Sequence, residues 1–482
     1  MPDTGEMGGP AIGVGDGTPS EPHGFRTYED SSGVSSGGGG GGDGCGCFLL
    51  VVVVLGIVLS VGIVKAITHH TDSIRVSTTV LRPPVALTTI AGDGTAGRIG
   101  AGGLAVAAEL NFCSNSTFGT TCGSSLGEDQ FGNVYFPEEG NDTVQMVAGS
   151  KFSPFLPRQP LTVGYLYTVA GSGIAGNGGN SSSAIGAELN GPCSVAIDKF
   201  DNLIIANIYA GTVRLVAGST SDPLLPGYVL TPGNIYTIVG GLNSPSGVAF
   251  DPSGNLIIVE MGANSVWLLA TNNADPLLPS RVLVPGRMYL VAGDGTPGYS
   301  GDHGPATDAE LTWPFGVSVD QHGNIYISDP RSGVIRLVAA TTSVAVLPDV
   351  TLTPGDIYTV VGTGTQGYSG NGGPAVRAEI DQAIDMPGTT APKYGSVALD
   401  KQGNLYIADS SNQVIRVVAA TPSVAVDHRA KLTAGDIYVL AGNGSCGFTT
   451  TELCAPTAIL VRPDGTFLFI DAGNNVVRSA RA

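Results

Sequence analysis

The chain has 482 residues and carries 22 Lys and Arg against 40 Asp and Glu, which gives a net charge of -18 at pH 7. A nucleic-acid ligand requires clustered basic side chains that neutralise its phosphates, and no such cluster stands out in the sequence. The composition therefore argues against a nucleic-acid partner.

The first 46 residues consist mainly of Gly, Ser, Pro and acidic residues and include an uninterrupted glycine run at positions 37–42. Such a segment cannot bury enough apolar surface to offset the entropy lost on ordering. We predict a disordered acidic tail over residues 1–46.

Residues 47–64 read CFLLVVVVLGIVLSVGIV and contain no charge, and Ala66 and Ile67 extend the apolar stretch beyond Lys65. A helix of about twenty residues crosses the ~30 Å hydrocarbon core of a bilayer. A signal sequence is the alternative, but the run is longer than a usual signal core and no A-x-A site follows it. We predict one transmembrane helix at residues 47–67 and a stalk at 68–86.

The flanks of the span bear on lipidation and orientation. Cys45 and Cys47 are candidates for acylation, although two small residues at a membrane boundary are the slightly favoured explanation. Basic residues follow the span and none precedes it within twenty residues, so the positive-inside rule places the remainder in the cytoplasm. Four glycosylation sequons favour the opposite orientation, and we expect the propeller to lie outside the cytoplasm. The sequons begin at Asn115, Asn141, Asn180 and Asn443.

The cysteines after the span also favour an oxidising compartment. We expect two disulfides within short loops, Cys113–Cys122 and Cys446–Cys454, with Cys193 free and buried. Pairing between different repeats through Cys193 is the alternative, because the sequence alone does not fix connectivity.

A segment of about twenty-five residues recurs six times between residue 87 and the C-terminus. The clearest copy, from Gly316, reads GVSVDQHGNIYISDPRSGVIRLVAA. Each copy has a first apolar strand, a turn opened by Asp, an alternating second strand and a third strand, and a longer loop then leads to a fourth strand. The opening aspartates are Asp129, Asp198, Asp251, Asp320, Asp400 and Asp464. We predict an all-β fold, a six-bladed β-propeller of four-stranded blades.

The two ends of the repeat region predict how the ring closes. The last copy stops at its third strand, and a strand of the fourth type, LTTIAG from Leu87, precedes the first copy. Placed beside residues 476–478, this strand would complete the sixth blade and remove an exposed sheet edge.

The repeat pattern P-x-G-V-A-x-D-x-x-G-N-L-Y-I-A-D-x-x-N-x-x-V-R resembles the NHL repeat. The linking stretch AGDGTPGYSGDHGPATDAEL at residues 292–311 is similar to the spacers of bacterial NHL arrays and of the teneurin propeller. The resemblance covers residues 87–482 and implies the propeller fold. It does not specify a function, since such propellers serve in adhesion, RNA binding and sensing and, in neighbouring families, in catalysis.

Several charged residues recur once per repeat and are therefore expected to support the blades. They are the pairs Asp329/Arg336, Asp409/Arg416 and Asp471/Arg478. In other copies Glu138, Asn207 and Glu260 replace the Asp. Trp267 replaces the Arg of the third copy, which makes it a candidate contact residue, with blade packing as the alternative.

The glycine-rich spacers lack the Lys of a phosphate-binding loop. Their acids Asp294, Asp302 and Asp308 could supply oxygen ligands to Ca²⁺, but a tight turn between blades is the simpler interpretation. No His pair has metal-ligand spacing, and no G-x-S-x-G motif occurs. We predict no catalytic, cofactor-binding or metal-binding residue.

The sequence therefore predicts a single-pass membrane protein that displays an acidic propeller and recognises a protein, peptide or glycan through loops on one face. One alternative is a metal-dependent hydrolase or lyase of the lactonase or amidating-lyase kind. Another is a structural surface protein that associates through Gly56 and Ser60 of the span. The oligomeric state is not indicated.

Overall fold

The computed structural model describes residues 85–113, 123–278, 281–384, 393–421 and 432–481. The predicted tail, the predicted span and almost all of the predicted stalk, including Cys45 and Cys47, lie outside these residues. Within the described part of the chain, no helix is long and apolar enough to cross a bilayer.

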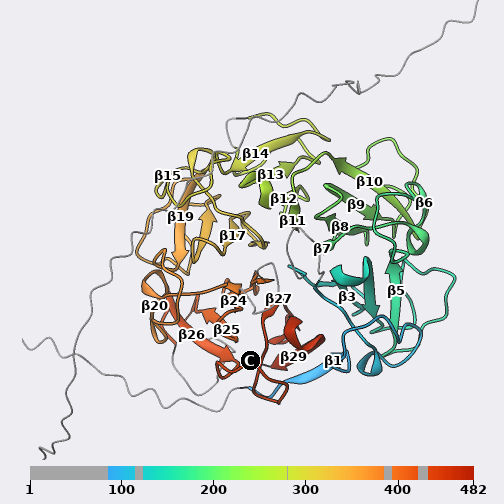
Figure 1. Cartoon of the computed structure of the whole chain (residues 1–482). Helices are drawn as coiled ribbons and strands as arrows, with labels where there is room; N and C mark the ends of the chain where they lie inside the picture. Colours follow the sequence, from blue (N-terminus) through green and yellow to red (C-terminus); the bar gives the residue numbers. More distant parts are fainter. Residues whose placement is uncertain (1–84, 114–122, 279–280, 385–392, 422–431, 482) are drawn as a thin grey trace, which may run out of the picture. The chain divides into compact units, whose positions relative to one another are not determined.

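Six antiparallel sheets are arranged in a ring, as the all-β propeller prediction requires (Figure 1). From the innermost strand outwards, blade 1 comprises β2 (Gly127–Glu128), β3 (Val134–Glu138), β4 (Thr143–Val147) and β5 (Leu166–Ala170). Blade 2 comprises β7 (Pro192–Ile197), β8 (Leu203–Asn207), β9 (Thr212–Val216), β10 (Asn234–Gly240) and β6 (Ser182–Ser183). Blade 3 comprises β11 (Pro245–Phe250), β12 (Leu256–Glu260), β13 (Ser265–Leu269) and β14 (Met288–Ala292).

The second half of the ring repeats this order. Blade 4 comprises β16 (Val317–Val319), β17 (Ile325–Asp329), β18 (Val334–Val338), β19 (Asp356–Val361) and β15 (Gly304–Pro305). Blade 5 comprises β23 (Val397–Leu399), β24 (Leu405–Asp409), β25 (Val414–Val418), β26 (Asp436–Ala441) and β20 (Gly373–Pro374). Blade 6 comprises β27 (Pro456–Val461), β28 (Thr466–Asp471), β29 (Val476–Arg481) and β1 (Thr88–Ala91).

The remaining elements are short. A two-stranded ribbon pairs β21 (Ala383–Ile384) with β22 (Lys393–Tyr394). The 3₁₀ turns are η1 (Ala105–Ala107), η2 (Glu139–Asn141), η3 (Ala184–Gly186), η4 (Met261–Ala263), η5 (Ala306–Asp308), η6 (Ala375–Arg377) and η7 (Ala472–Asn474).

The predicted closure of the ring is confirmed. Strand β1 pairs antiparallel with β29, with Thr88 opposite Ser479 and Ala91 opposite Val477, so the N-terminal strand completes the last blade (Figure 1). Apolar side chains of blades 6 and 1 then share one buried cluster that includes Phe136 and Leu468. Each of the other five neighbouring pairs of blades also shares such a cluster, so the core is distributed around the ring.

The spacers differ from the plain loops that the sequence suggests. In blades 2, 4 and 5 the spacer adds a short fifth strand, β6, β15 or β20, to the outer edge of the sheet. Each of these strands leads into a 3₁₀ turn, η3, η5 or η6. Blade 3 keeps four strands because its spacer is much shorter.

The recurring Asp–x–x–Gly–Asn sequence has a local physical cause, seen clearly in blade 5. Asp400 Oδ1 accepts hydrogen bonds from the backbone N–H groups of Gln402 and Asn404, which closes the turn. The Asn404 Nδ2 group donates to Asp400 Oδ2 at 2.6 Å. Asn404 Oδ1 in turn accepts from the N–H of Ala420, at the end of the third strand. The turn residues therefore fix the register of three strands.

Candidate functional site

The antiparallel order of the strands gives the ring two different faces. The Asp-opened turns and the long loops between third and fourth strands lie at one end of each sheet, here called the turn face. The spacers and the turns between second and third strands lie at the other end, here called the spacer face. On the spacer face, Asn412 Nδ2 donates to Gly367 O and Asn474 Nδ2 donates to Gly447 O, so turns and spacers are bonded to one another.

The repeated arginines serve to hold these spacers. Arg416 is fully buried, donates to the carbonyl oxygens of Glu379 and Ser369, and lies 3.3 Å from Asp409 Oδ2. Burial raises the pKa of Asp409 to about 7, although Arg416 opposes this shift. These groups are sequestered from any ligand, so their role is structural.

Blade 4 departs from the expected pairing. Arg336 forms its ion pair with Asp302 of the spacer, at 2.9 Å, and it also donates to Ser300 O and Glu310 O. The predicted partner, Asp329, instead accepts a hydrogen bond from the N–H of Thr312, and burial raises its pKa to about 7. Asp302 therefore serves the blade and is already engaged as a hydrogen-bond acceptor.

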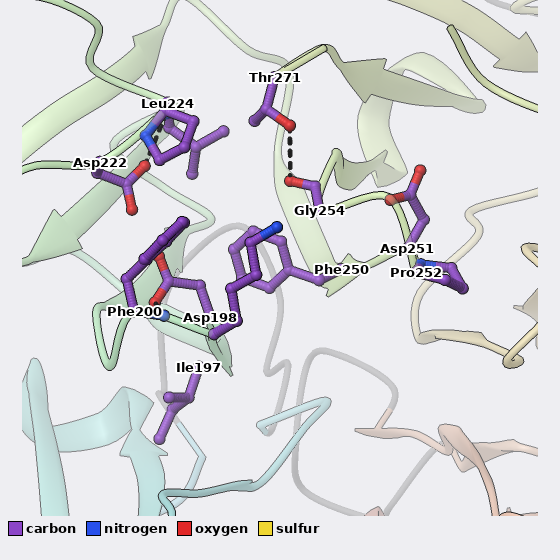
Figure 2. A pocket seen from close by; sticks show the side chains of 12 residues that line it. Ile197, Asp198, Phe200, Asp222, Leu224, Phe250, Asp251, Pro252, Gly254 and Thr271 are labelled. Atoms are coloured by element: carbon purple, nitrogen blue, oxygen red, sulfur yellow. Dashed lines mark hydrogen bonds between the residues drawn. The ribbon is translucent and has the colours of Figure 1, made fainter.

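A small pocket of about 170 Å³ opens on the turn face between blades 2 and 3 (Figure 2). Its walls include the rings of Phe200 and Phe250, and the Lys199 ammonium lies 5.3 Å from the centre of the Phe200 ring. The carboxyl groups of Asp222 and Asp251 also line it. Two buried acids beside aromatic rings are the kind of arrangement that could suggest catalysis.

The repeat explains these acids without catalysis. In blade 1 the Tyr135 hydroxyl donates to Asp129 Oδ2 at 2.7 Å. Blade 2 has Ile204 in place of that tyrosine, and Asn202 Nδ2 bonds both Asp198 and the additional acid Asp222. Burial raises the pKa of Asp222 well above its ordinary range, and the Asp198 carboxylate raises it further.

Blade 3 repeats this exchange. Ile257 replaces the tyrosine, and Asn255 Nδ2 bonds both Asp251 and Asp275. The carboxyl pairs of blades 2 and 3 therefore replace a tyrosine hydroxyl in the turn network. They are part of the scaffold.

The spacer face carries a different arrangement near the ring axis. Buried Cys193, Ile208, Phe315 and Tyr394 form one cluster, and they come from blades 2, 4 and 5. Beside this cluster the Arg331 guanidinium lies 5.2 Å from the Trp313 ring centre and 5.8 Å from that of Tyr394. Arg331 Nε donates to the Tyr394 hydroxyl at 3.1 Å. Trp313 is 41% exposed, so an aromatic ring and a guanidinium are both presented to solvent.

The backbone at Trp313 is unusual. This residue immediately precedes the Pro that leads into the first strand, and its φ is 55°, in the left-handed region that favours glycine. Other blades hold the same conformation at the same place with smaller residues, namely Gly191, Ser244 and Ala455. The fold therefore imposes positive φ here in these four blades, and of the four, blade 4 alone places a large aromatic side chain on it.

The structure places the predicted site residues separately. Cys446 and Cys454 form a disulfide, Cys113 is disulfide-bonded, Cys122 lies outside the described residues, and Cys193 is free and buried. Trp267 is half-buried in β13, and its indole N–H donates to Ser265 Oγ. Of these residues, Cys193 belongs to the buried cluster beside the Trp313–Arg331 pair.

The sequons also differ in their surroundings. Asn180 and Asn443 are exposed, whereas Asn141 Nδ2 donates to Gly97 O and to Glu138 Oε1. Asn115 lies outside the described residues. A glycan on Asn141 Nδ2 would take the place of one of the two N–H groups that make these hydrogen bonds. In the described part of the chain, no group of three His, Cys, Asp or Glu side chains is placed to hold a metal ion.

Sequence reasoning did not single out Trp313, Arg331 or Tyr394. A usable signal exists in the aligned repeats, where Trp-Pro at 313–314 stands in register with Gly-Pro at 191–192 and Ser-Pro at 244–245. Arg331 and Tyr394 lie 63 residues apart in different blades, so only folding brings them together.

Comparisons with known proteins establish the fold. A protein of unknown function from Bacteroides thetaiotaomicron is 14% identical with a TM-score of 0.50, over 83% of this chain and 76% of that one. An auxiliary nutrient binding protein from the same organism is 13% identical, with a TM-score of 0.48 over 83% and 76% of the two chains. A virginiamycin B lyase from Staphylococcus aureus is 11% identical, with a TM-score of 0.37 over 77% and 87%.

No protein-family model matches the chain, and no curated protein sequence matches it significantly. At these identities the structural likeness extends to the propeller fold alone. The resemblance to the NHL family stays a prediction from the repeat pattern.

Proposed function

We propose that this chain is a membrane-anchored recognition protein whose propeller binds its ligand on the spacer face, beside the ring axis. The observation that carries the proposal is Trp313, a large aromatic side chain held in a strained backbone conformation and left 41% exposed. Exposed aromatic and arginine side chains are the residue types that contribute most to binding interfaces.

The neighbouring groups favour binding. Tyr394 is buried beneath the pair and accepts a hydrogen bond from Arg331, which fixes the guanidinium plane. Held in this way, Arg331 loses little conformational entropy when it donates its remaining N–H groups to a ligand. The ring as a whole is a rigid frame on which such loops are displayed.

In this proposal residues 47–67 form the membrane anchor and the propeller faces away from the cytoplasm. The charge-free stretch supports the anchor, and the disulfide between Cys446 and Cys454 supports an oxidising compartment.

Ligand binding can be tested with immobilised full-length chain and extracts that contain the surface material of its own cells. The wild-type chain and the turn-face variant Phe200→Ala should retain the same material. Trp313→Ala and Arg331→Ala should lose it. Equal retention by all four proteins would contradict the proposal.

Orientation needs a separate experiment. Protease added to intact cells should degrade the propeller if it faces outward. Complete protection, with degradation only after the membrane is permeabilised, would place it in the cytoplasm and overturn the proposed display.

A further inference from the structure

Three consecutive blades present an aromatic ring at the same place on the spacer face. The rings are Tyr299, Tyr368 and Phe448, which are 40%, 48% and 52% exposed. They follow the same glycine in the aligned spacers of blades 4, 5 and 6, within GYSG, GYSG and GFTT. The spacers that enter blades 1 and 2 have Arg98 and Asn177 at this place, so the aromatic rings are confined to one half of the ring.

Each ring is supported from below by the buried arginine of its own blade. The distance from the guanidinium carbon to the ring centre is 5.2 Å for Arg336 and Tyr299, and 5.4 Å for Arg416 and Tyr368. It is 4.8 Å for Arg478 and Phe448. Since these guanidinium groups are fixed by hydrogen bonds to spacer carbonyls, the rings are held in place, and their exposed fractions leave contact area for a ligand.

The surface around these rings continues from one spacer to the next. A Cβ atom added to Gly364 of the blade 5 spacer would lie 2.8 Å from the Tyr299 ring. One added to Gly94 would lie 3.6 Å from the Phe448 ring. The missing side chain of Gly364 therefore lets its spacer approach Tyr299 closely, whereas Gly94 is in ordinary contact range of Phe448. The segment of Trp313 lies beside that of Tyr299, since Thr312 Oγ1 donates to Gly298 O and Pro297 pairs with Leu311. We call the four rings the aromatic row: Trp313, Tyr299, Tyr368 and Phe448.

A groove of about 450 Å³ adjoins Tyr299 along the outer strand of blade 4. The spacers of blades 4 and 5 and the long loop of blade 4, at Leu347 and Val350, line it. Its lining combines Tyr299 and Val376 with the polar side chains of Asp302, His303 and Thr363. The Tyr299 hydroxyl is hydrogen bonded to Thr359 at 2.9 Å, which fixes the ring at the groove edge. Apolar surface with a few placed polar groups is the usual composition of a small-ligand site.

From these features we infer that the ligand of the proposed recognition function is a neutral glycan chain that lies along the aromatic row. A pyranose ring has an apolar face of C–H groups and a rim of hydroxyls, so it stacks on an aromatic ring while its rim takes hydrogen bonds. A chain of such units can stack on several aromatic rings that recur once per blade. The net charge of -18 disfavours a polyanionic ligand such as a polyuronate.

The chain carries a built-in reporter for this inference, because it has only two tryptophans, Trp267 and Trp313. In a Trp267→Phe background, fluorescence of the full-length chain in detergent reports Trp313 alone. Cellohexaose, laminarihexaose and chitohexaose are the neutral probes, and a hexagalacturonate is the charged comparison. We expect one neutral hexamer to shift the Trp313 emission and bind, and its trimer to bind more weakly because it spans fewer rings.

Variants along the row then locate the binding. Tyr368→Ala and Phe448→Ala should each weaken the neutral hexamer about tenfold, as removal of a central aromatic contact does. Tyr368→Phe and Phe448→Tyr keep the ring and should bind as the parent does. Phe200→Ala removes an aromatic side chain that is 40% exposed on the opposite face and should have no effect.

The inference rests on the proposed function, but the two can fail separately. No binding of any neutral hexamer, or binding that survives Tyr368→Ala and Phe448→Ala, overturns the glycan inference. If a protein or peptide is instead retained in a Trp313-dependent manner, the recognition function stands and only its ligand class is wrong. If no retained material depends on Trp313, both are wrong.

Discussion

Arg462 and Glu128 form a two-point ion pair that joins the last blade to the first. Arg462 Nε donates to Glu128 Oε2 at 2.9 Å, and Nη2 lies 2.7 Å from Oε1. The residues are 334 positions apart in the sequence, and both side chains are partly buried. Arg462 directly follows the inner strand of blade 6, and Glu128 lies in the inner strand of blade 1. This pair therefore joins blades 6 and 1 at their inner strands, whereas β1 closes the ring as the outer strand of blade 6.

The first prediction concerns this pair. Arg462→Ala and Glu128→Ala should each lower the free energy of unfolding by about 1 kcal/mol, since partly exposed ion pairs contribute little. A double-mutant cycle measured by urea unfolding should give a coupling energy of roughly 0.5–1 kcal/mol. A coupling energy near zero would show that the closure relies on β1 and the apolar cluster alone.

Removal of β1 should have a much larger effect. A full-length chain in which residues 87–92 are replaced by a Gly/Ser segment loses the fourth strand of blade 6 and exposes the edge of β29. We expect a clear fall in Tm and concentration-dependent aggregation in light scattering, because an unpaired strand edge is a template for association. Unchanged thermal unfolding would contradict closure by this strand.

The buried ion pair of blade 5 gives a third prediction. Arg416→Gln leaves the Asp409 carboxyl buried without its charged partner, and it should cost about 3 kcal/mol or more in unfolding free energy. The double variant Arg416→Gln with Asp409→Asn removes both charges and should be less destabilised than the single variant. A double variant less stable than the single one would contradict this view.

The carboxyl pairs of blades 2 and 3 predict a pH dependence. The pKa of Asp222 is raised to about 7 by burial first and by Asp198 second, and Asp275 behaves likewise beside Asp251. A carboxyl with a raised pKa binds its proton more tightly in the folded state. Its contribution to stability is therefore complete below about pH 4 and is lost as the pH rises through about 7.

Substitution of these acids by Asn should remove that dependence. For Asp222→Asn and Asp275→Asn, we compare the free energy of unfolding of each variant with that of the wild type. This difference should be about 1–3 kcal/mol more favourable to the variant at pH 8 than at pH 4. Urea unfolding at the two pH values measures this change. Asp294→Asn, at an exposed spacer position, is the control and should show no such change. A gain that is larger at pH 4 would reverse the sign and refute the assignment.

Trp313 provides the fifth prediction. Trp313→Gly places at this position the residue that blade 2 has at Gly191, where φ is 62°. Relief of the left-handed strain offsets the lost contact with Arg331, so the free energy of unfolding should change by less than about 1 kcal/mol. An ordinary buried Trp would cost about 3–5 kcal/mol on truncation. We expect Trp313→Gly to lose ligand binding while it keeps its stability. A loss of about 3–5 kcal/mol in the free energy of unfolding would instead show that Trp313 serves packing.

Much of the fold could be predicted from the sequence because its signals are local. The Asp–x–x–Gly–Asn turns bond within a few residues of themselves, as Asp400 and Asn404 do, so they specify strand register wherever they occur. Four blades have this full pattern, blade 2 has Asp in place of the Gly, and blade 6 closes the same turn between Arg462 and Thr466. These six turns, with a spare fourth strand at Leu87, then determine the blade number and the closure. The candidate site was less predictable. The contact residue that the sequence predicts, Trp267, breaks the arginine repeat; it is half-buried in its blade and donates to Ser265.

The sequence by itself determined the ring, its register and the partner of its last strand, since hydrogen bonding within turns and apolar alternation are short-range properties. Only the tertiary structure decided which side chains meet between blades. It paired Arg336 with Asp302 and left Asp329 apart. It also gathered Trp313, Arg331 and Tyr394 on one face of the ring, from blades 4 and 5. These encounters depend on how neighbouring sheets pack and twist around the axis, and no spacing along the chain encodes that geometry directly.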